Sequence, residues 1–378
     1  MRVVHIIKAK QIAGAETHLL TLLPLLQQHA FEIHLLLLVE AAYPMQDLIQ
    51  QMQAQGIAVQ SIPIVADLDP RSFLKLYRAI KALQPDLVHT HLIHADTHGI
   101  PAAKWAGVKT IVSSRHAADL FRRRQPLKSL NRLVMRLTRK TIAISDSIKH
   151  IMITYDGLPP EKIQRIHYGL AHQPISEVTI QAQRQQLRAD LNLAPNTFIM
   201  GMVCRLIEEK AIPYVLEALA LLADQDAQLI IFGDGPLRDS LHAQSRVLGL
   251  AERVSWLGWR DDARQIMAGF DLFLMPSLSE GFGMALLEAM ACRLPIIASN
   301  VASLPEIVAD QVSGLLVPPA DVPAIAAALD QLIQDPERLK SLGKAGEKRL
   351  ESHFTADRMA QETADCYRSI SQRENPTS

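Results

Sequence analysis

Two carboxylates and a glycine turn stand together toward the C-terminal end of the chain. The segment 276–291 follows an apolar run, 270–275, that predicts a buried strand, and it continues into a predicted helix. Glu280 lies in the turn and Glu288 projects from the early helix. The first N–H groups of a helix and the positive end of its dipole attract anions. This arrangement predicts a sugar-nucleotide site, with simple dipole complementation by glutamates as the alternative.

Two cations precede this segment. Arg205 and Lys210 follow the apolar run 198–203, which predicts another strand, so both would lie at its C-terminal edge. A guanidinium binds a diphosphate through two parallel hydrogen bonds, and an ammonium binds it as a point charge. The pair therefore predicts a diphosphate clamp. The competing interpretation is a pair of solvated cations.

The N-terminal half offers a turn glycine and several histidines. Gly14 lies between the predicted strand 3–7 and a helix, where backbone N–H groups can face an anion; a structural turn glycine is the alternative. His89 and His91 end another strand and point to one face, so we expect one to be buried support and the other to be exposed at the tip. No third ligand is spaced near them, which argues against a metal site. His116 is a weaker candidate.

Basic residues crowd positions 115–140, where Asp119 is the only acidic residue. The part 131–138 has a helical pattern, with Arg132 and Arg136 on one side and leucine and valine on the other. Such a helix indicates docking on anionic lipid, each cation contributing ~1 kcal/mol near that surface. A solvated basic face and a phosphorylated acceptor are the two alternatives.

Bulk composition narrows the class of protein. The 378 residues are 48% hydrophobic and carry 39 acidic and 39 basic side chains, so net charge predicts no nucleic-acid partner. Three distant cysteines have no metal-type spacing and indicate a reducing compartment. The N-terminal apolar run, interrupted by Lys8, is too short for a signal peptide, and no apolar stretch approaches the ~20 residues that span a bilayer. We expect a cytoplasmic protein.

Strand and helix patterns alternate along both halves of the chain, which predicts an α/β fold with two parallel sheets and helices on both faces. A polar stretch, 169–196, separates two series of strands, and we place the interdomain linker near its start. The strands are predicted at 3–7, 33–39, 57–64, 87–90, 110–113 and 141–144, and then at 198–203, 228–232, 254–257, 272–275 and 295–298.

These motifs together resemble the retaining glycosyltransferases of family 4 (glycosyl transferases group 1), whose GT-B fold has two Rossmann-like domains facing a central cleft. Glu280 and Glu288 are similar to the E-x7-E motif of the family, and the turn 233–236 to its G-x-G-P loop. The turn at Gly14 resembles G-G-A-E with Ala13 for one glycine. The segment 204–211 resembles G-R-L…K-G, with cysteine and alanine for its glycines.

The resemblance implies a role for each motif. Glu288 would accept hydrogen bonds from ribose hydroxyls, Glu280 would contact the donor sugar, and His91 would contact groups in the cleft. The implied catalytic residues are Glu280, Arg205, Lys210 and His91. The implied substrate-binding residues are Gly14, Gly233, Gly235, Leu257, Phe282, Gly283, Met284 and Glu288, with no metal ligand and no cofactor.

The resemblance also implies an acceptor-binding domain at 1–172, a nucleotide-sugar-binding domain at 173–355, and a C-terminal helix, 356–378, that packs back on the first. The implied reaction moves a sugar from a nucleotide-diphosphate sugar to a hydroxyl of a cell-surface polysaccharide or lipid-linked acceptor. A UDP-sugar is favoured, with a GDP-sugar as the other option, and the expected location is the inner face of the plasma membrane. A nucleotide-sugar 2-epimerase and a non-catalytic sugar-nucleotide-binding subunit are the alternatives.

Overall fold

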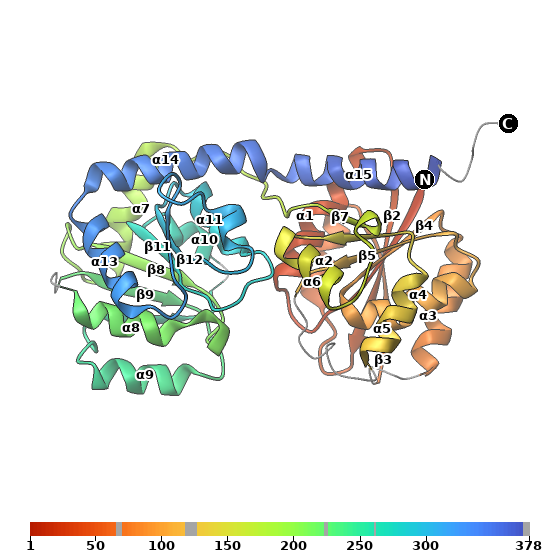
Figure 1. Ribbon diagram of the computed structural model, residues 1–378, viewed down its shortest axis with the longest axis horizontal. Helices are drawn as coiled ribbons and strands as arrows, with labels where there is room; N and C mark the ends of the chain where they lie inside the picture. The colour runs from red at the N-terminus through yellow and green to blue at the C-terminus, as the bar shows by residue number, and fades with distance from the viewer. Residues whose placement is uncertain (66–69, 118–126, 223–225, 261, 373–378) are drawn as a thin grey trace. The chain divides into compact units, whose positions relative to one another are not determined.

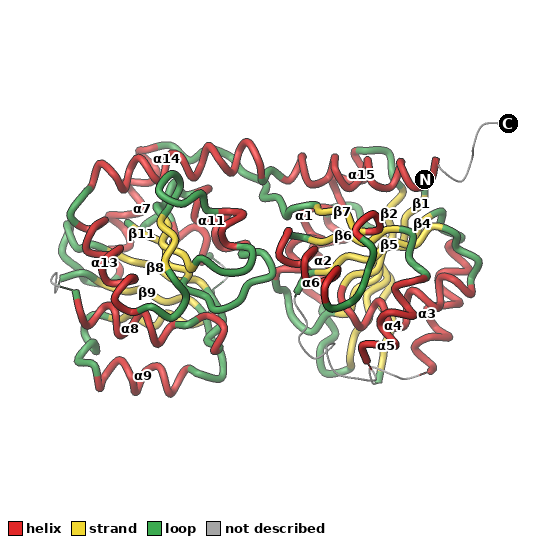
Figure 2. The backbone as a smooth tube through the Cα atoms, in the orientation of Figure 1, coloured by secondary structure: helices red, strands yellow, loops and turns green. Residues whose placement is uncertain are grey.

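The computed structural model describes residues 1–65, 70–117, 127–222, 226–260 and 262–372. The chain divides into two compact units: unit 1 comprises Met1–Ala171 and Thr355–Ser378, and unit 2 comprises His172–Phe354. Each unit is built on a wholly parallel sheet with helices packed around it (Figure 1, Figure 2). The predicted α/β architecture is confirmed in both halves.

The sheet of unit 1 has the strand order β3-β2-β1-β4-β5-β6-β7. Its inner strands read as apolar runs because both faces are covered, as in β2, where Leu35 to Val39 are all buried. The three-residue strand β7 was not predicted, because so short a segment carries no pattern. The strands are β1 (Arg2–Lys8), β2 (Glu32–Glu40), β3 (Ala58–Ile64), β4 (Leu87–His91), β5 (Thr110–Arg115), β6 (Lys140–Ala143) and β7 (Ile163–Arg165).

The last helix of the chain belongs to unit 1. It packs on α1, and its buried Tyr367 meets the edge of Phe31 at a ring-centroid distance of 5.6 Å. Leu170 and Thr355 form a parallel bridge where the chain leaves and re-enters the unit. The helices of unit 1 are α1 (Gly14–Gln28), α2 (Gln46–Ala54), α3 (Pro70–Leu83), α4 (Leu92–Trp105), α5 (Leu127–Arg136), α6 (Asp146–Thr154), the short 3-10 helix η2 (Pro160–Lys162) and α15 (Ala356–Gln372).

Helix α5 differs from its sequence-based prediction. The sequence pattern predicts a helix at 131–138, whereas α5 spans Leu127–Arg136. Val134 is buried, but Leu130, Leu133 and Leu137 are 43%, 60% and 38% exposed. The apolar stripe therefore extends beyond what the sheet covers. Residues 118–126, which include three arginines of the basic segment, lie outside the described part of the chain.

The sheet of unit 2 repeats the topology of unit 1, with the order β10-β9-β8-β11-β12-β13. One buried cluster contains alternate side chains of its strands, such as Met200 and Met202 or Leu229 and Ile231, which lie on one face of the sheet. The short strand β13 was not predicted. The strands are β8 (Ile199–Val203), β9 (Gln228–Phe232), β10 (Val254–Gly258), β11 (Leu272–Met275), β12 (Ile296–Ser299) and β13 (Leu315–Val317).

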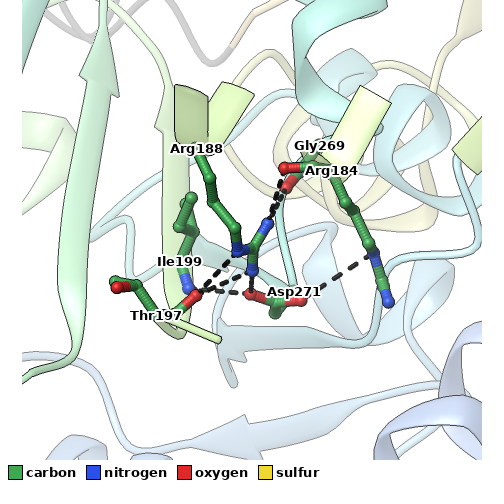
Figure 3. Close-up of polar contacts among 6 residues, drawn as sticks. All are labelled: Arg184, Arg188, Thr197, Ile199, Gly269 and Asp271. Atoms are coloured by element: carbon green, nitrogen blue, oxygen red, sulfur yellow. Dashed lines mark hydrogen bonds and ion pairs between the residues drawn. The ribbon is translucent and has the colours of Figure 1, made fainter. Parts of the chain in front are cut away.

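A buried arginine fixes the first helix of unit 2 to this sheet (Figure 3). Arg188 of α7 donates to the carbonyl oxygens of Thr197, Arg184 and Gly269 and pairs with the carboxylate of Asp271. The helices of unit 2 are α7 (Glu177–Asp190), the short 3-10 helix η3 (Glu208–Lys210), α8 (Ile212–Leu221), α9 (Arg238–Val247), α10 (Ala263–Met267), α11 (Met284–Ala291), α12 (Leu304–Ile307), α13 (Val322–Ile333) and α14 (Pro336–His353).

Candidate functional site

Each sheet has a point at which its connections change direction. In unit 1 this point lies between β1 and β4, because β2 and β3 extend the sheet to one side while β5, β6 and β7 extend it to the other. In unit 2 it lies between β8 and β11 for the same reason. Loops leaving the carboxyl ends of two such strands diverge and open a crevice where α/β proteins bind ligands. The predicted site residues gather around these two switch points.

Lys210 and Glu280 meet at the switch point of unit 2. The chain leaves β8 through the exposed Arg205 and forms η3, which carries Lys210, while the loop after β11 carries Glu280. The Lys210 ammonium pairs with Oε1 of Glu280, which also accepts a hydrogen bond from Ser277 Oγ at 3.1 Å. The two charged side chains are only 16% and 12% exposed. Because burial reduces screening by salt, this ion pair holds both charges in place.

Gly233 and Gly235 let the loop after β9 lie against the loop after β8. Gly233 has a φ of +143°, and a Cβ atom added there would lie 1.8 Å from the carbonyl oxygen of Cys204. A Cβ atom at Gly235 would lie 2.5 Å from the carbonyl oxygen of Leu206. Only glycine fits at these positions. The two loops thus form one continuous backbone edge.

Cys204 stands on this edge where the family pattern has glycine. Burial raises the pKa of its thiol to about 12, while Lys210 lowers that pKa and Glu280 raises it to smaller extents. A thiol with so high a pKa stays protonated at neutral pH and is a weak nucleophile.

The turn before α11 is fastened from within unit 2. Gly283 is its N-cap, with a φ of +101°. The buried Ser303 donates to the carbonyl oxygen of Phe282 at 3.0 Å. Met284 begins the helix, so backbone N–H groups of this first turn lack partners within the helix. Glu288 follows one turn later and is half-buried.

Leu257 lies on β10 and is half-buried. The next residue, Gly258, accepts a hydrogen bond from Gly233 N at 2.8 Å, which ties β10 to the glycine edge. Trp256 packs at the margin of the core and stacks on His242 at a centroid distance of 4.5 Å. Unit 2 therefore contains Arg205, Lys210, Gly233, Gly235, Leu257, Glu280, Phe282, Gly283, Met284 and Glu288, while unit 1 contains Gly14 and His91.

Gly14 opens α1 at the switch point of unit 1. A Cβ atom added there would meet no described atom within 4 Å, so packing within the protein does not require a glycine. The N–H of Ala13 donates to Glu16 Oε2 at 3.0 Å, which is half of a capping box. Burial raises the pKa of Glu16, opposed by smaller effects of backbone hydrogen bonds.

Five buried histidines lie at the same switch point. They are His5 of β1, His18 of α1, His89 and His91 of β4, and His116 directly after β5. The fully buried rings of β1 and β4 contact one another, with centroids 4.1 to 5.2 Å apart. We call this group the histidine cluster.

Three members of the histidine cluster form a hydrogen-bonded chain. His5 Nδ1 lies 2.9 Å from His91 Nε2, and His91 Nδ1 lies 3.1 Å from His116 Nε2. His116 Nδ1 in turn bonds the hydroxyl of Tyr168. A neutral imidazole donates with one nitrogen and accepts with the other, so the three tautomers are set together.

The expectation that either His89 or His91 is exposed was wrong. Their exposed fractions are 1% and 0%. His89 bonds the hydroxyl of Tyr367 at 2.6 Å and Ser114 Oγ at 2.8 Å. Because α15 comes from the far end of the chain, its covering of the β4 histidines could not be inferred from local sequence.

The argument from spacing against a third metal ligand was also wrong. β1 pairs with β4 in a register that places His5 opposite His89, and ligand atoms of His5, His89 and His91 all lie within 4.8 Å of one another. In this structure, however, nitrogens of all three rings bond protein groups. The metal independence of the protein stays a prediction.

Burial lowers the pKa of every ring of the histidine cluster. The pKa values of His5 and His116 fall to about 3. Those of His18, His89 and His91 fall well below the ordinary value, where neighbouring histidines add to the effect of burial. Loss of water disfavours the charged imidazolium. The histidine cluster is therefore neutral at pH 7.

Sequence reasoning named His91 and ranked His116 lower, and it missed several partners. Glu16 and His18 lie within one turn of Gly14, and that position could have revealed them. His5 gave no such signal, because only the β1–β4 register brings it to His89. The same is true of Tyr168 and Tyr367, which come from distant parts of the chain.

Two protein families match consecutive parts of the chain. Glycosyltransferase Family 4 matches residues 12–173, and Glycosyl transferases group 1 matches residues 183–349. The chain belongs to the family 4, group 1 glycosyltransferases. The strands of the β8–β11 switch point lie within the second matched segment, and α1 and β4 lie within the first, which begins after β1.

Similar proteins agree with this family. UDP-Gal:alpha-D-GlcNAc-diphosphoundecaprenol alpha-1,3-galactosyltransferase of Escherichia coli is 29% identical over 286 residues, 73% of each chain. Alpha-D-kanosaminyltransferase of Streptomyces kanamyceticus is 26% identical over 350 residues, 85% of this chain and 90% of the relative. HepE of Anabaena, solved with UDP-glucose, superposes with a TM-score of 0.84 over 98% of this chain and 100% of its own, at 23% identity. That likeness shows the GT-B fold of this glycosyltransferase.

The two switch points of the glycosyltransferase offer different chemistry. That of unit 2 carries cations and a carboxylate on a glycine-lined edge, which can neutralise a departing diphosphate. That of unit 1 carries uncharged rings and a carboxyl group with a raised pKa.

No helix in the described part of the chain is both long and apolar enough to cross a membrane.

Proposed function

We propose that this glycosyltransferase moves a sugar from a UDP-sugar to a hydroxyl of a cell-surface polysaccharide or lipid-linked acceptor, with retention at the anomeric carbon. The observation that carries the proposal is the Lys210–Glu280 ion pair at the β8–β11 switch point. A donor diphosphate would replace Glu280 as the partner of Lys210. Glu280 would then be free to accept hydrogen bonds from sugar hydroxyls, and the exposed Arg205 would supply the second cation.

Relatives support the choice of donor and acceptor. HepE has been solved with UDP-glucose, and the Escherichia coli relative is named for UDP-galactose and a lipid diphosphate acceptor. Other relatives are named as an alpha-D-kanosaminyltransferase, an N-acetyl-alpha-D-glucosaminyl L-malate synthase and a D-inositol 3-phosphate glycosyltransferase. A UDP-hexose or UDP-N-acetylhexosamine is therefore the favoured donor, with a GDP-sugar as the other option. The 2-epimerase and the non-catalytic subunit are not favoured.

We propose a same-face displacement for the transfer step. The bond between the anomeric carbon and the diphosphate oxygen breaks, and the acceptor oxygen bonds the same face of that carbon. The acceptor proton passes to the departing phosphate oxygen. Arg205, Lys210 and the N-terminus of α11 stabilise the negative charge that develops on the diphosphate. Glu288 holds the ribose hydroxyls.

The role proposed for His91 follows from its bonds. Both of its ring nitrogens are engaged in the hydrogen-bonded chain, and none of its surface is exposed. His116 is the member of that chain with the largest exposed fraction, 8%. We therefore propose that His91 positions His116, and that His116 and Gly14 meet the substrates.

Peripheral contact of the basic segment 115–140 with anionic lipid on the inner face of the plasma membrane is part of the proposal. The exposed Leu130 and Leu133 of α5 support it, because they lie beside the exposed Arg132 and Arg136. Such a helix can bury leucine side chains at the lipid boundary while its arginines bind phosphates.

Calorimetry and thermal-shift measurements with UDP, GDP, ADP and their common sugar conjugates test the donor site. We expect selective stabilisation by UDP and a UDP-sugar. The stabilisation should be lost in Glu288→Ala and kept in Glu337→Ala, a control on an exposed face of α14. Absence of binding by every nucleotide would contradict the proposal, and selective GDP binding would replace the donor.

A further inference from the structure

A second surface of unit 1 exposes a group of aromatic side chains. α3 and α4 pack side by side (Figure 1), and Trp105, the last residue of α4, is 71% exposed. Its ring centroid lies 5.3 Å from that of Phe73 and 5.8 Å from that of Tyr77, both on α3. Leu74 is 44% exposed on the same helix. We call Phe73, Leu74, Tyr77 and Trp105 the aromatic patch.

Cations accompany the aromatic patch. The sequence of α3 contains no acidic residue and four basic ones, all exposed: Arg71, Lys75, Arg78 and Lys81. Lys104 and Lys109, on either side of Trp105 in sequence, are exposed as well. The Lys81 ammonium lies 5.5 Å from the centroid of the Tyr77 ring and donates to its hydroxyl at 3.0 Å. Asp86, the first acidic residue after α3, accepts a hydrogen bond from the backbone N–H of Arg2.

Packing within unit 1 does not explain why a tryptophan stands exposed at position 105. A large indole that keeps most of its surface in water loses the free energy that burial would give it. Apolar patches rimmed by polar groups mark interaction sites. Tryptophan and tyrosine, with an apolar body and a polar tip, settle at membrane–water boundaries. Lysine and arginine attract anionic lipid headgroups and extend along apolar surface.

We propose that the aromatic patch docks on an anionic lipid bilayer. Trp105 inserts at the level of the headgroups, and the cations of α3 and the end of α4 bind lipid phosphates. The inference rests on the proposed function in one respect, since a lipid-linked acceptor gives the enzyme a reason to work at a bilayer. It adds a contact on α3 and α4 to the one proposed for α5, and α5 also packs against α4.

Vesicle binding by the full chain tests this proposal. The probes are vesicles of phosphatidylcholine alone and vesicles in which phosphatidylglycerol replaces part of it, with co-sedimentation and tryptophan emission as readouts. We expect binding to the anionic vesicles only, accompanied by a blue shift of the emission. Trp105→Ala should weaken the partition constant roughly tenfold or more, because an inserted indole carries a large apolar area. Lys104→Gln should weaken it about fivefold.

A matched variant controls for the loss of an exposed tryptophan. Trp259 is 66% exposed and belongs to unit 2. Trp259→Ala should bind anionic vesicles as the wild type does. Equal binding by Trp105→Ala and the wild type would overturn the proposal, and so would equal binding to both kinds of vesicle.

Two further readouts separate this inference from its competitors and from the proposed function. Trp105→Ala should keep the thermal midpoint and the transfer rate of the wild type with a water-soluble acceptor. If the wild type forms an oligomer in light scattering that Trp105→Ala does not form, and the wild type does not bind vesicles, the aromatic patch contacts a second copy of the chain. That outcome would overturn the proposal. Transfer to the soluble acceptor without vesicle binding would contradict the proposed bilayer contact and would still support the proposed function. Vesicle binding without transfer would support the bilayer contact and contradict the proposed function.

Discussion

The two switch points of this molecule share one topology and carry opposite chemistry. The order β3-β2-β1-β4-β5-β6 of unit 1 is matched by β10-β9-β8-β11-β12-β13 in unit 2. At the first, the histidine cluster is neutral and almost sealed from water. At the second, Lys210 and Glu280 are charged, partly exposed and paired with each other.

The difference in charge between the two switch points follows from the cost of burying each kind of side chain. Burial of a neutral ring costs little once its nitrogens are hydrogen-bonded, so several rings can be stacked without a counter-charge. A buried charge needs a partner, and here Glu280 supplies it where the proposal places a diphosphate. Unit 1 therefore holds a pre-set group of donors and acceptors. Unit 2 holds charges that can change partners.

Acid should destabilise unit 1, and this is the largest effect that we expect. The ordinary histidine pKa of 6.5 falls to about 3 for His5 and His116 in the folded protein. Between these values the unfolded chain binds more protons, so stability is complete above pH 6.5 and falls as the pH drops. Each such histidine costs about 1.4 kcal/mol per pH unit in this range. The histidine cluster together should cost several kcal/mol between about pH 7.5 and about pH 5.5.

Tryptophan placement allows the two units to be measured separately. A variant without Trp256 and Trp259 leaves Trp105 to report urea unfolding of unit 1, and a variant without Trp105 reports unit 2. Unit 1 should lose stability more steeply with acid. An equal loss in both units would contradict the comparison.

Removal of the buried charge of α7 should have the next largest effect. Arg188→Met removes the guanidinium that bonds three carbonyl oxygens and pairs with the Asp271 carboxylate, which keeps only uncharged and longer contacts such as the N–H of Ile199 at 2.8 Å (Figure 3). We expect a loss of about 3–5 kcal/mol in the free energy of unfolding of unit 2. Arg184→Met is the control, because this side chain lies 3.8 Å from Asp271 and is 29% exposed, and it should cost at most about 1 kcal/mol. Equal losses in the two variants would assign the effect to a general change in α7 rather than to the contacts of Arg188.

Loss of the diphosphate clamp should lower the rate of sugar transfer. Lys210→Ala should lower turnover by roughly 10²- to 10³-fold, because a preorganised donor to the developing charge is removed. Arg205→Ala should act in the same direction. Steady-state transfer with a UDP-sugar measures the change, and Lys340→Ala, on an exposed face of α14, should leave it unaltered. Full activity in both clamp variants would exclude the proposed role of unit 2.

The smallest effect is expected where α15 meets the histidine cluster. Tyr367→Phe removes the hydroxyl that bonds His89 Nδ1 and leaves that buried nitrogen unsatisfied. The free energy of unfolding should fall by about 1–3 kcal/mol in urea titrations. Tyr43→Phe, at a side chain 46% exposed, should change it by no more than about 0.5 kcal/mol. An unchanged free energy of unfolding in Tyr367→Phe would show that His89 finds another hydrogen-bond partner.

Local pattern predicted most of the fold. Apolar runs of the β2 and β11 type, separated by amphipathic stretches, indicate strands and helices of a parallel sheet. The prediction failed at β7 and β13, because three residues carry no period. The bounds of α5 also differ from the prediction, because the pattern placed the helix at 131–138 and it spans Leu127–Arg136.

The candidate sites were predicted unevenly. Glu280, Lys210 and the glycines of unit 2 lie in compact motifs; Lys210 meets Glu280 at the β8–β11 switch point, and Gly233 and Gly235 lie on the loop after β9, against the loop after β8. In unit 1 the resemblance implied that His91 contacts groups in the cleft, whereas its ring contacts come from β1, α1 and the segment after β5.

The sequence by itself determined the alternating α/β pattern, the glycine turns and the charged residues of the donor edge, because these depend on side chains a few positions apart. Tertiary structure alone decided that His5 faces His89, that Tyr367 of α15 covers them, and that Lys210 meets Glu280 rather than solvent. Those contacts depend on strand register and on the return of a distant helix. Register is set by the packing of whole faces, and no local stretch of the chain encodes it.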